Sequence, residues 1–298
     1  MKAQTGIALI QVLIISFILA LLGIFINQSI QQQVKVTQQI QNKFAMRLEL
    51  EEAETQLFSA LLAHKKYPDT NSNNQLVKNW NFYGEEFRLS DSIFISLMDM
   101  KSLFSLNISS PDLIKNLLIQ LNVEENTAQT FVSSLTDWKD ENDVSRVNGA
   151  EASFYKQQGK RYVPRNGYLQ SVNEAALIRG AEQIPKEYFA RYFSTEMVTG
   201  FNPINAPEAI LKAIIKDEST ANKVLKRRAA GTLSSYDFYL LTGIEEGEFI
   251  NFVTGSKIRV QLRVVLNGAQ LSKQYILDAT PRSYIKPMVF SQVSWNKS

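Results

Sequence analysis

The pattern of apolar and polar positions begins with a nearly unbroken apolar run over residues 7–26, interrupted only by Gln11, Ser16 and Gly23. As an α-helix this run would be about 30 Å long, which matches the hydrocarbon core of a bilayer. A helix satisfies its backbone hydrogen bonds within itself, as lipid requires. The one charge before the run is Lys2, and positive charge stays on the cytoplasmic side. We therefore predict a single-pass membrane helix with a cytoplasmic N-terminus and the bulk of the chain across the membrane.

The apolar spacing then changes to about 3.5 residues between Gln28 and His64, a stretch without proline or glycine. Helix formers dominate it, so we expect the membrane helix to continue as an amphipathic stalk to about residue 65. Polar loop residues 67–74 end the stalk. Partial alternation over residues 87–99, with a Ser-Asp-Ser turn inside it, predicts a hairpin or two short strands, and the run closes at residues 103–107.

Helical periodicity returns at Ser109-Ser110-Pro111-Asp112, where a cap candidate precedes proline in the first turn. A second helix is expected from Glu124 to Trp138. Further helices are predicted over residues 171–179, 185–193, 206–216, 219–230, 234–241 and 245–253. These short helices and their polar loops predict a compact all-α unit of about 140 residues.

Strand alternation resumes at Lys257–Leu266, and Asn267-Gly268 is the strongest short hairpin signal that a sequence offers. The return strand is expected at residues 270–279, and residues 284–295 are a candidate for a last one. The predicted fold class is therefore α+β: a long N-terminal helix, and an α/β domain with an antiparallel sheet that a large all-α insertion domain interrupts. The predicted boundaries are 7–65 for the membrane helix and stalk, 66–108 and 255–298 for the two parts of the α/β domain, and 109–254 for the insertion.

The composition narrows the possible functions. The net charge is +3 with both signs interspersed, which gives no electrostatic argument for nucleic-acid binding. Cysteine is absent, so disulfides, thiol catalysis and cysteine metal sites are excluded. The one histidine, His64, is expected at a helix end as a surface or capping residue. No acid–base or metal-hydrolase spacing is present, and we predict that the protein is not an enzyme.

The densest polar cluster follows the second predicted insertion helix. It contains five candidate metal ligands: Asp137, Asp140, Asn142, Asp143 and Glu151. Hard oxygen ligands at intervals of two or three residues suit Ca²⁺, which takes about 6–8 oxygens. The spacing is not that of an EF-hand. A solvated acidic loop is the alternative, and Glu141 could exchange roles with Asp140.

The residues at the start of the chain allow three interpretations of the apolar run. A cleavable signal peptide has a shorter apolar core followed by small residues, and neither is present here. A plain signal anchor fits the composition. However, Lys2, Gly6 and the run that starts at Ile7 resemble the prepilin leader of the type IV pilin and type II secretion pseudopilin families. That resemblance implies that residues 1–6 are a leader, which a prepilin peptidase removes after Gly6 before it methylates Ile7.

The fifth position of the implied mature chain departs from those families. Most members carry glutamate there, whose carboxylate can pair with the N-terminal amine of a neighbouring subunit, whereas this chain has Gln11. Glutamine cannot neutralise an ammonium group in lipid, where an unpaired charge is expensive. A subunit with Gln11 suits the end of a filament better than its repeated middle.

A second resemblance covers nearly the whole chain. The non-acidic Gln11 and the segments 104–107, 137–155, 164–180 and 202–207 are similar to the K-type minor pseudopilin family of the type II secretion system. The resemblance implies a pilin-like α/β domain with a helical insertion that binds structural Ca²⁺. It also implies a place at the pseudopilus tip with the I- and J-type minor pseudopilins, an inner-membrane anchor with a periplasmic head, and contact with the inner-membrane secretion platform.

Residues 201–211 also resemble the start of a helix-hairpin-helix DNA-binding unit. Such a unit continues with a glycine-rich hairpin that binds phosphate, but the nearest equivalent here, residues 241–247, carries Glu245 and Glu246. The basic run over residues 223–228 precedes a predicted helix end, where it complements the helix dipole. We therefore predict no nucleic-acid binding. The alternative function is a bitopic envelope receptor that captures DNA or exoproteins through the helical head.

Overall fold

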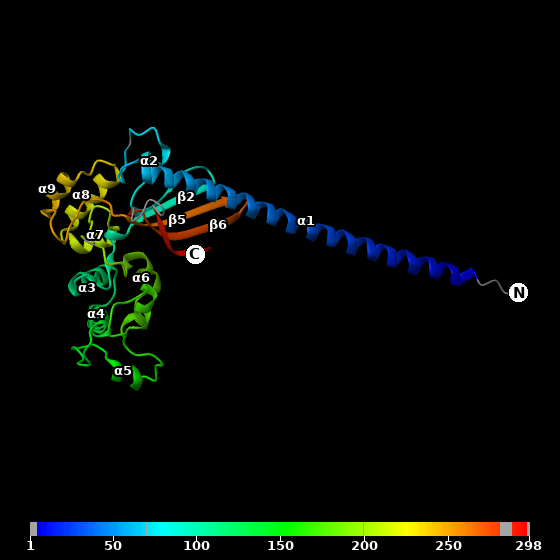
Figure 1. Ribbon diagram of the computed structural model, residues 1–298. Coiled ribbons are helices and arrows are strands. Elements are labelled where there is room, and N and C mark those ends of the chain that lie inside the picture. Colours follow the sequence, from blue (N-terminus) through cyan, green and yellow to red (C-terminus); the bar gives the residue numbers. More distant parts are fainter. Residues whose placement is uncertain (1–4, 70, 199, 281–287, 297–298) are drawn as a thin grey trace.

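A computed structural model describes residues 5–69, 71–198, 200–280 and 288–296. A single helix, α1 (Thr5–Ala63), runs for 59 residues and projects far beyond the rest of the molecule (Figure 1). The predicted continuous membrane and stalk helix is therefore confirmed over the described residues. Only its C-terminal part is buried on one face, through side chains at helical spacing: Met46, Leu50, Ala53, Leu57, Ala60 and Leu61.

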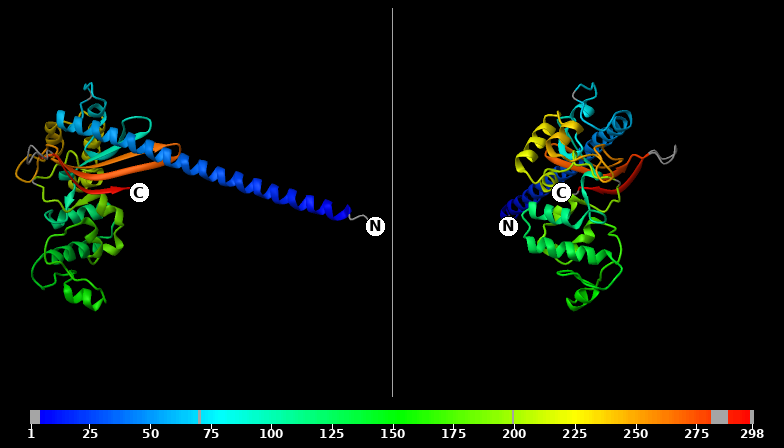
Figure 2. Two further views of the ribbon diagram at one scale, coloured as in Figure 1. Left: turned by 45° about the vertical axis from the view of Figure 1, so that its right-hand side comes forward. Right: turned by 90° about the vertical axis from the view of Figure 1, so that its left-hand side faces the viewer.

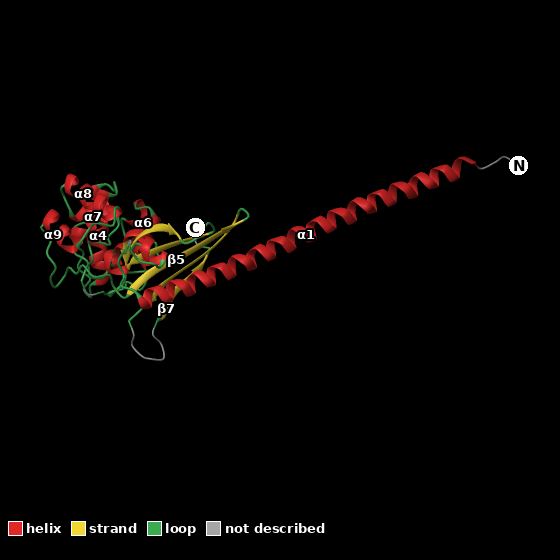
Figure 3. Ribbon diagram, turned by 90° about the horizontal axis from the view of Figure 1, so that it is seen from above, coloured by secondary structure: helices red, strands yellow, loops and turns green. Residues whose placement is uncertain are grey.

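That face of α1 packs on a five-stranded antiparallel sheet of order β1-β2-β5-β6-β7 (Figure 3). The bounds are β1 (Tyr83–Arg88), β2 (Ile93–Asp99), β5 (Lys257–Leu266), β6 (Ala269–Asp278) and β7 (Val289–Trp295). The predicted hairpin near residue 90 and the Asn267-Gly268 turn are both confirmed. Asn267 and Gly268 have φ of 51° and 76°, as a tight two-residue turn requires. Of the predicted last strand, residues 288–295 are described, and residues 284–287 lie outside the described part.

Strand β5 alternates as its sequence predicts. Ile258, Val260, Leu262 and Val264 are fully buried in the core that the sheet shares with α1. On the opposite face, Arg259 donates from Nη1 to the carbonyl oxygen of Ala190 (2.7 Å). Burial lowers the pKa of Arg259 to about 10. Alternation in this strand therefore fixes which face meets α1 and which meets the helical head.

The head consists of short helices around a second hydrophobic core. The predicted helices at residues 111, 124, 185, 206, 219 and 234 are confirmed within two or three residues at their starts. Residues 171–179 form a 3-10 helix and a following turn instead of an α-helix. The described elements are α3 (Pro111–Gln120), α4 (Glu125–Lys139), α5 (Ala152–Gln157), η2 (Val172–Leu177), η3 (Ala181–Gln183), α6 (Lys186–Tyr192), β4 (Phe193–Ser194), α7 (Glu208–Ile214), α8 (Glu218–Ala229) and α9 (Ser235–Thr242).

Two predictions about the head need correction, and two short helices were not predicted. The insertion is not all-α, because β4 pairs in parallel with β3 (Phe104–Ser105). The short helices α2 (Gln75–Asn79) and α5 were not predicted, since five or six residues carry too little periodicity. The predicted helix over residues 245–253 is wrong.

Residues 245–253 form an irregular segment with one isolated bridge, because some of their backbone groups bond to Phe201. The Phe201 N–H donates to the carbonyl oxygen of Phe249 (2.8 Å), and the Asn251 N–H donates to that of Phe201 (2.9 Å). Gly247 lies within the segment and donates to the carbonyl of Ile250 (2.9 Å). A pairing across about fifty residues therefore overrides the local helical pattern.

The buried carboxylate of Asp99 joins the points where the chain leaves and re-enters the sheet. It accepts backbone N–H groups of Lys101 (3.0 Å) and Gly255 (3.2 Å). The side-chain amides of Asn202 (3.0 Å) and Asn205 (3.2 Å) also donate to it. Burial raises the pKa of Asp99, and the four hydrogen bonds oppose that rise. One side chain thus links sheet, head and return segment.

We expect Asp99→Ala to lower the free energy of unfolding by about 2–4 kcal/mol, because it leaves buried amide donors without an acceptor. Denaturant unfolding of the purified protein measures this loss. The matched control is Asp91→Ala in the exposed β1–β2 turn. Equal stability of the two variants would contradict a linking role for Asp99.

Candidate metal centre

Three of the five candidate ligands meet at one place in the head. Carboxylate oxygens of Asp137, Asp140 and Glu151 all lie within 4.8 Å of one another. Asp137 lies in the last turn of α4, Asp140 directly follows that helix, and Glu151 precedes α5. The end of one helix and the start of another therefore bring together charges that are separated in sequence.

A cation from the same loop already contacts this cluster. Arg146 donates from Nη1 to Asp137 Oδ1 (2.7 Å) and forms an ion pair with Asp140. Its backbone N–H donates to Asp137 Oδ2 (3.1 Å). These contacts raise the pKa of Arg146, so the guanidinium compensates two of the three carboxylates.

The third carboxylate has no partner. Glu151 is 2% exposed, and neither of its side-chain oxygens has a hydrogen-bond partner among the described residues. Burial raises the pKa of Glu151 to about 7, and repulsion from Asp137, Asp140 and Asp143 adds to the rise. An orphaned buried carboxylate beside two others is the environment that a hard cation would satisfy. The donor set therefore fits a calcium ion.

The remaining candidates lie at the edge of the cluster. Asn142 is exposed, donates from Nδ2 to Asp140 Oδ1 (2.9 Å) and accepts the backbone N–H of Val144 (2.8 Å). Asp143 is exposed and is not part of the three-carboxylate group, although its charge acts on Glu151. Glu141 is also outside the group, so Asp140 is the member of the Asp140/Glu141 pair that faces the cluster.

Two functional residues of this loop were not singled out as such in the sequence. The first is Arg146: the sequence shows that it lies among the acidic residues, but it does not show which of them it contacts. Gly149 is the other: a Cβ built on it would lie 1.9 Å from Asp137 Oδ2. Its carbonyl accepts Arg179 Nη1 (2.9 Å), which fixes the backbone against the head. Only glycine allows this close approach to the carboxylate.

The apolar helix is exposed where a membrane would cover it. Among the described residues, one helix is long and apolar enough to span a bilayer, and its apolar part is not buried. Gln11 lies on this exposed helix. Gly6 and Ile7 lie within α1, and residues 1–4 lie outside the described part.

The segment that resembles a DNA-binding motif has a structural role. The side chains of Asn202 and Asn205 are buried against Asp99 instead of facing solvent. In the basic run, Arg227 pairs with Asp237 (2.7 Å), and Arg228 donates to the carbonyl of Ile204 (3.2 Å). These contacts explain the asparagines of the motif-like segment and the charges of the basic run without a phosphate ligand.

A family model described as type II secretion system (T2SS), protein K, matches residues 101–192. This range contains the three clustered carboxylates and Arg146. The type II secretion system protein K of Klebsiella pneumoniae is 27% identical over 263 residues, which are 80% of this chain and 79% of that protein. The protein of the same name from Aeromonas hydrophila is 26% identical over 261 residues, 76% of each chain.

A solved structure has the same fold. The crystal structure of the GspK-GspI-GspJ complex from the type 2 secretion system of enterotoxigenic Escherichia coli contains a chain that matches with a TM-score of 0.54. The match covers 88% of this chain and 99% of that one, at 16% sequence identity. The chain is similar to the type II secretion protein K family in sequence, and to a solved structure of that family in fold. The resemblance found in the sequence is confirmed, as is the mixed fold with a long N-terminal helix and an antiparallel sheet. With this similarity, the one exposed apolar helix among the described residues fits a bitopic membrane protein of the secretion system.

We expect the ion-free protein to lose stability as the pH rises from about 4.5 to about 7. In this window the unfolded Glu151 is ionised, whereas the folded pKa of about 7 keeps the buried carboxyl protonated. The loss should be on the order of 3 kcal/mol and should level off above pH 7. Chemical unfolding in chelator at several pH values measures it. The variant Glu151→Gln should lack this component, and parallel pH curves for the two proteins would contradict the assignment.

Proposed function

We propose that this protein acts as the K-type minor pseudopilin at the tip of the type II secretion pseudopilus. There it nucleates or caps the filament with other minor pseudopilins, for export of folded proteins across the outer membrane. The observation that carries the proposal is the combination of a 59-residue helix, free over most of its length, with a bulky head beside its far end.

The stalk part of α1 offers an apolar surface for partner helices. Ile40, Phe44 and Leu48 recur every four residues beyond the apolar membrane run, and each is more than half exposed. Apolar side chains at helical spacing are stabilised by packing against a second helix, as in other helical assemblies. Helices of the I- and J-type minor pseudopilins are the partners we propose for this face.

The shape of the head favours an end position. Helices α3–α6 (green) lie to one side of the α1 axis, so the molecule is much wider at the head than along the stalk (Figure 2). If this subunit repeated along a narrow filament, the next copy of this bulky head would lie close beside the first along the filament axis. Gln11 also lacks the charge that compensates a neighbour's N-terminal amine. Both features suit one copy at the tip.

The resemblance of residues 1–6 to a prepilin leader suggests how the protein is processed before assembly. We propose that the prepilin peptidase cuts after Gly6 and methylates Ile7, and that the inner-membrane platform then extracts the anchored protein. The N-terminus would face the cytoplasm and the head the periplasm. No catalytic role is proposed for the protein itself.

We propose in addition that Ca²⁺ stabilises the head through Asp137, Asp140 and Glu151, with Asn142 and Asp143 as further oxygen donors. The partnerless carboxylate of Glu151 supports this proposal. The ion would supply the positive charge that Glu151 lacks, and it would take the place of Arg146 at Asp137 and Asp140. It would also tie the end of α4 to the start of α5.

Stalk contacts can be tested by charge insertion. We expect Phe44→Glu to reduce co-purification with the I- and J-type partners at least tenfold, because a charge in an apolar helix interface costs several kcal/mol. Quantitative affinity co-purification from membranes that contain all three proteins measures the loss. The matched control is Gln39→Glu, an exposed polar position on the same stalk. Equal recovery of partners by both variants would contradict a role for this face.

Calcium binding can be tested through its competitor. We expect Arg146→Met to bind Ca²⁺ about tenfold more tightly than the unaltered protein, because ion binding no longer has to displace the guanidinium from Asp137 and Asp140. Glu151→Gln should bind at least tenfold more weakly. Calorimetric titration of the full-length protein in detergent measures both.

The control for this titration is Arg161→Met, which removes a positive charge from an exposed position of the head. If Arg146→Met and Arg161→Met bind alike, the guanidinium does not compete with the ion. If the unaltered protein binds no Ca²⁺ at millimolar concentration, the calcium proposal is wrong.

A further inference from the structure

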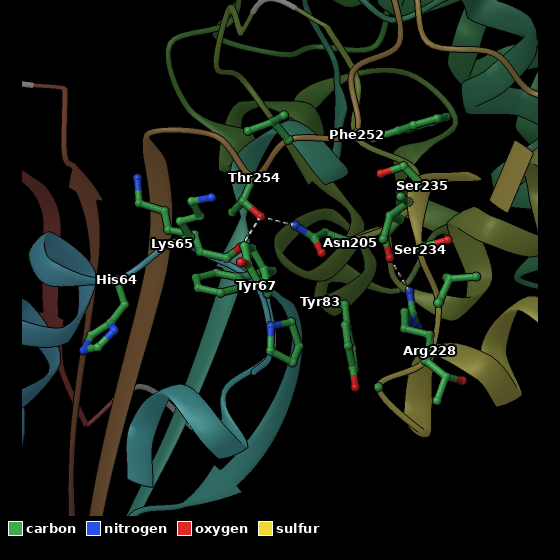
Figure 4. A pocket seen from close by; sticks show the side chains of 18 residues that line it. His64, Lys65, Tyr67, Tyr83, Asn205, Arg228, Ser234, Ser235, Phe252 and Thr254 are labelled. Carbon is green, nitrogen blue, oxygen red and sulfur yellow. Dashed lines mark hydrogen bonds between the residues drawn. The ribbon is translucent and has the colours of Figure 1, made fainter. Parts of the chain in front are cut away.

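A cavity of about 840 Å³ lies between the end of α1 and the α8–α9 region. Figure 4 shows His64, Lys65 and Tyr67 on one side, Arg228 and Ser234 on the other, and Asn205 and Thr254 between them. The cavity is therefore formed where the stalk end, the helical head and the return segment meet. None of the residues assigned above to metal binding or helix assembly lines it.

The hydrogen bonds of the junction hold the wall of this cavity in place. Thr254 Oγ1 donates to the carbonyl oxygen of Lys66 (2.7 Å) and accepts from Asn205 Nδ2 (2.9 Å). Asn205 is in turn bonded to the buried Asp99. These hydrogen bonds tie Thr254, Asn205 and the Lys66 backbone of the cavity wall to the junction at Asp99.

The lining is cationic. It includes Lys65, Lys66 and Arg228, and it contains no carboxylate. Arg228 lies 4.1 Å from the ring centroid of Tyr83, and its Nη1 donates to backbone carbonyls. Among the described residues it has no ion pair with a carboxylate. Burial lowers the pKa of Arg228, and the charges of Glu85 and Glu208 oppose this fall only in part, so an additional anion beside the guanidinium would stabilise its charge.

The lining is also apolar in part. Phe82, Leu233 and Phe252 contribute to it beside the cations. A volume in this range holds several side chains or a small organic group, whereas a bare inorganic anion would leave the apolar part unused. The position argues against a membrane lipid, since the cavity lies at the end of α1 opposite the N-terminus, and the part of α1 beyond the apolar run over residues 7–26 is roughly 55 Å long (Figure 1).

We propose that this cavity binds a segment of a partner polypeptide in which an aromatic or aliphatic side chain is flanked by carboxylates. The apolar side chain packs against Phe82, Leu233 and Phe252, and the carboxylates meet Lys65 and Arg228. Charge complementarity selects this occupant, because the lining offers positive charge and apolar surface together. The inference does not depend on the tip position, and it adds a docking site at the end of the molecule that the stalk contacts leave free.

Three matched peptides test this proposal on the full-length protein in detergent. One contains phenylalanine flanked by Asp and Glu, the second replaces these acids by Asn and Gln, and the third keeps the acids but replaces phenylalanine by glycine. Fluorescence anisotropy of labelled peptides measures binding. We expect the first peptide to bind at least tenfold more tightly than either of the others, and its affinity to fall when NaCl is raised from about 0.15 M to about 0.5 M.

Two charge reversals locate the site. Lys65→Glu, at an exposed position of the cavity rim, should weaken binding of the first peptide about tenfold. Lys156→Glu makes the same charge change on α5, far from the cavity, and should have no effect. Equal effects of the two variants, or equal affinity for the acidic and the amide peptide, would overturn the proposal. Displacement of the peptide by inorganic phosphate at equal concentration would also overturn it, because the cavity would then be a small-anion site.

Discussion

Four donors converge on the buried carboxylate of Asp99, and they come from three parts of the chain: the start of the head at Lys101, the segment with Asn202 and Asn205, and the return at Gly255. A buried carboxylate is tolerable only when its oxygens are hydrogen-bonded, so these segments must be together for any of them to be stable. The interaction explains how an insertion of about 150 residues can leave the sheet intact. The two strands on either side of it, β2 and β5, pair directly, with Asp99 opposite Ile258. The insertion therefore begins and ends at the same edge of the molecule.

This arrangement divides the protein into two cores with different functions. The sheet core holds the end of α1, and the ion pair of Glu54 with Lys273 (2.6 Å) adds a polar contact at its edge. The head core holds helices that have few partners outside the head. The hydrogen bonds of Asp99 join the two, so that a helix embedded in a membrane or filament can carry a large head. The carboxylate cluster and the cationic cavity lie in different parts of that head, so ion binding and partner binding need not interfere.

Local patterns in the sequence predict the elements but not the contacts between them. Lys257–Leu266 alternates strictly at first and forms a strand, and Asn267-Gly268 forms the turn, because both patterns are visible within a short window of sequence. The helix predicted over residues 245–253 does not form, because the backbone of this segment bonds to Phe201. For the candidate metal centre, the acidic residues are visible in the sequence, whereas the contact of Arg146 with Asp137 and the missing partner of Glu151 are not. The link between Asp99 and Asn202 or Asn205 spans more than one hundred residues, so no window of sequence contains it.

The central functional claim is that this chain enters a pseudopilus, and its N-terminus is where that claim is tested most directly. The measurement is the intact mass of the protein from its native membrane, in cells with and without the prepilin peptidase. The account predicts a mass that lacks residues 1–6 and carries one added methyl group, only when the peptidase is present. An uncut N-terminus in both strains, or a cut after Ile26, would contradict it.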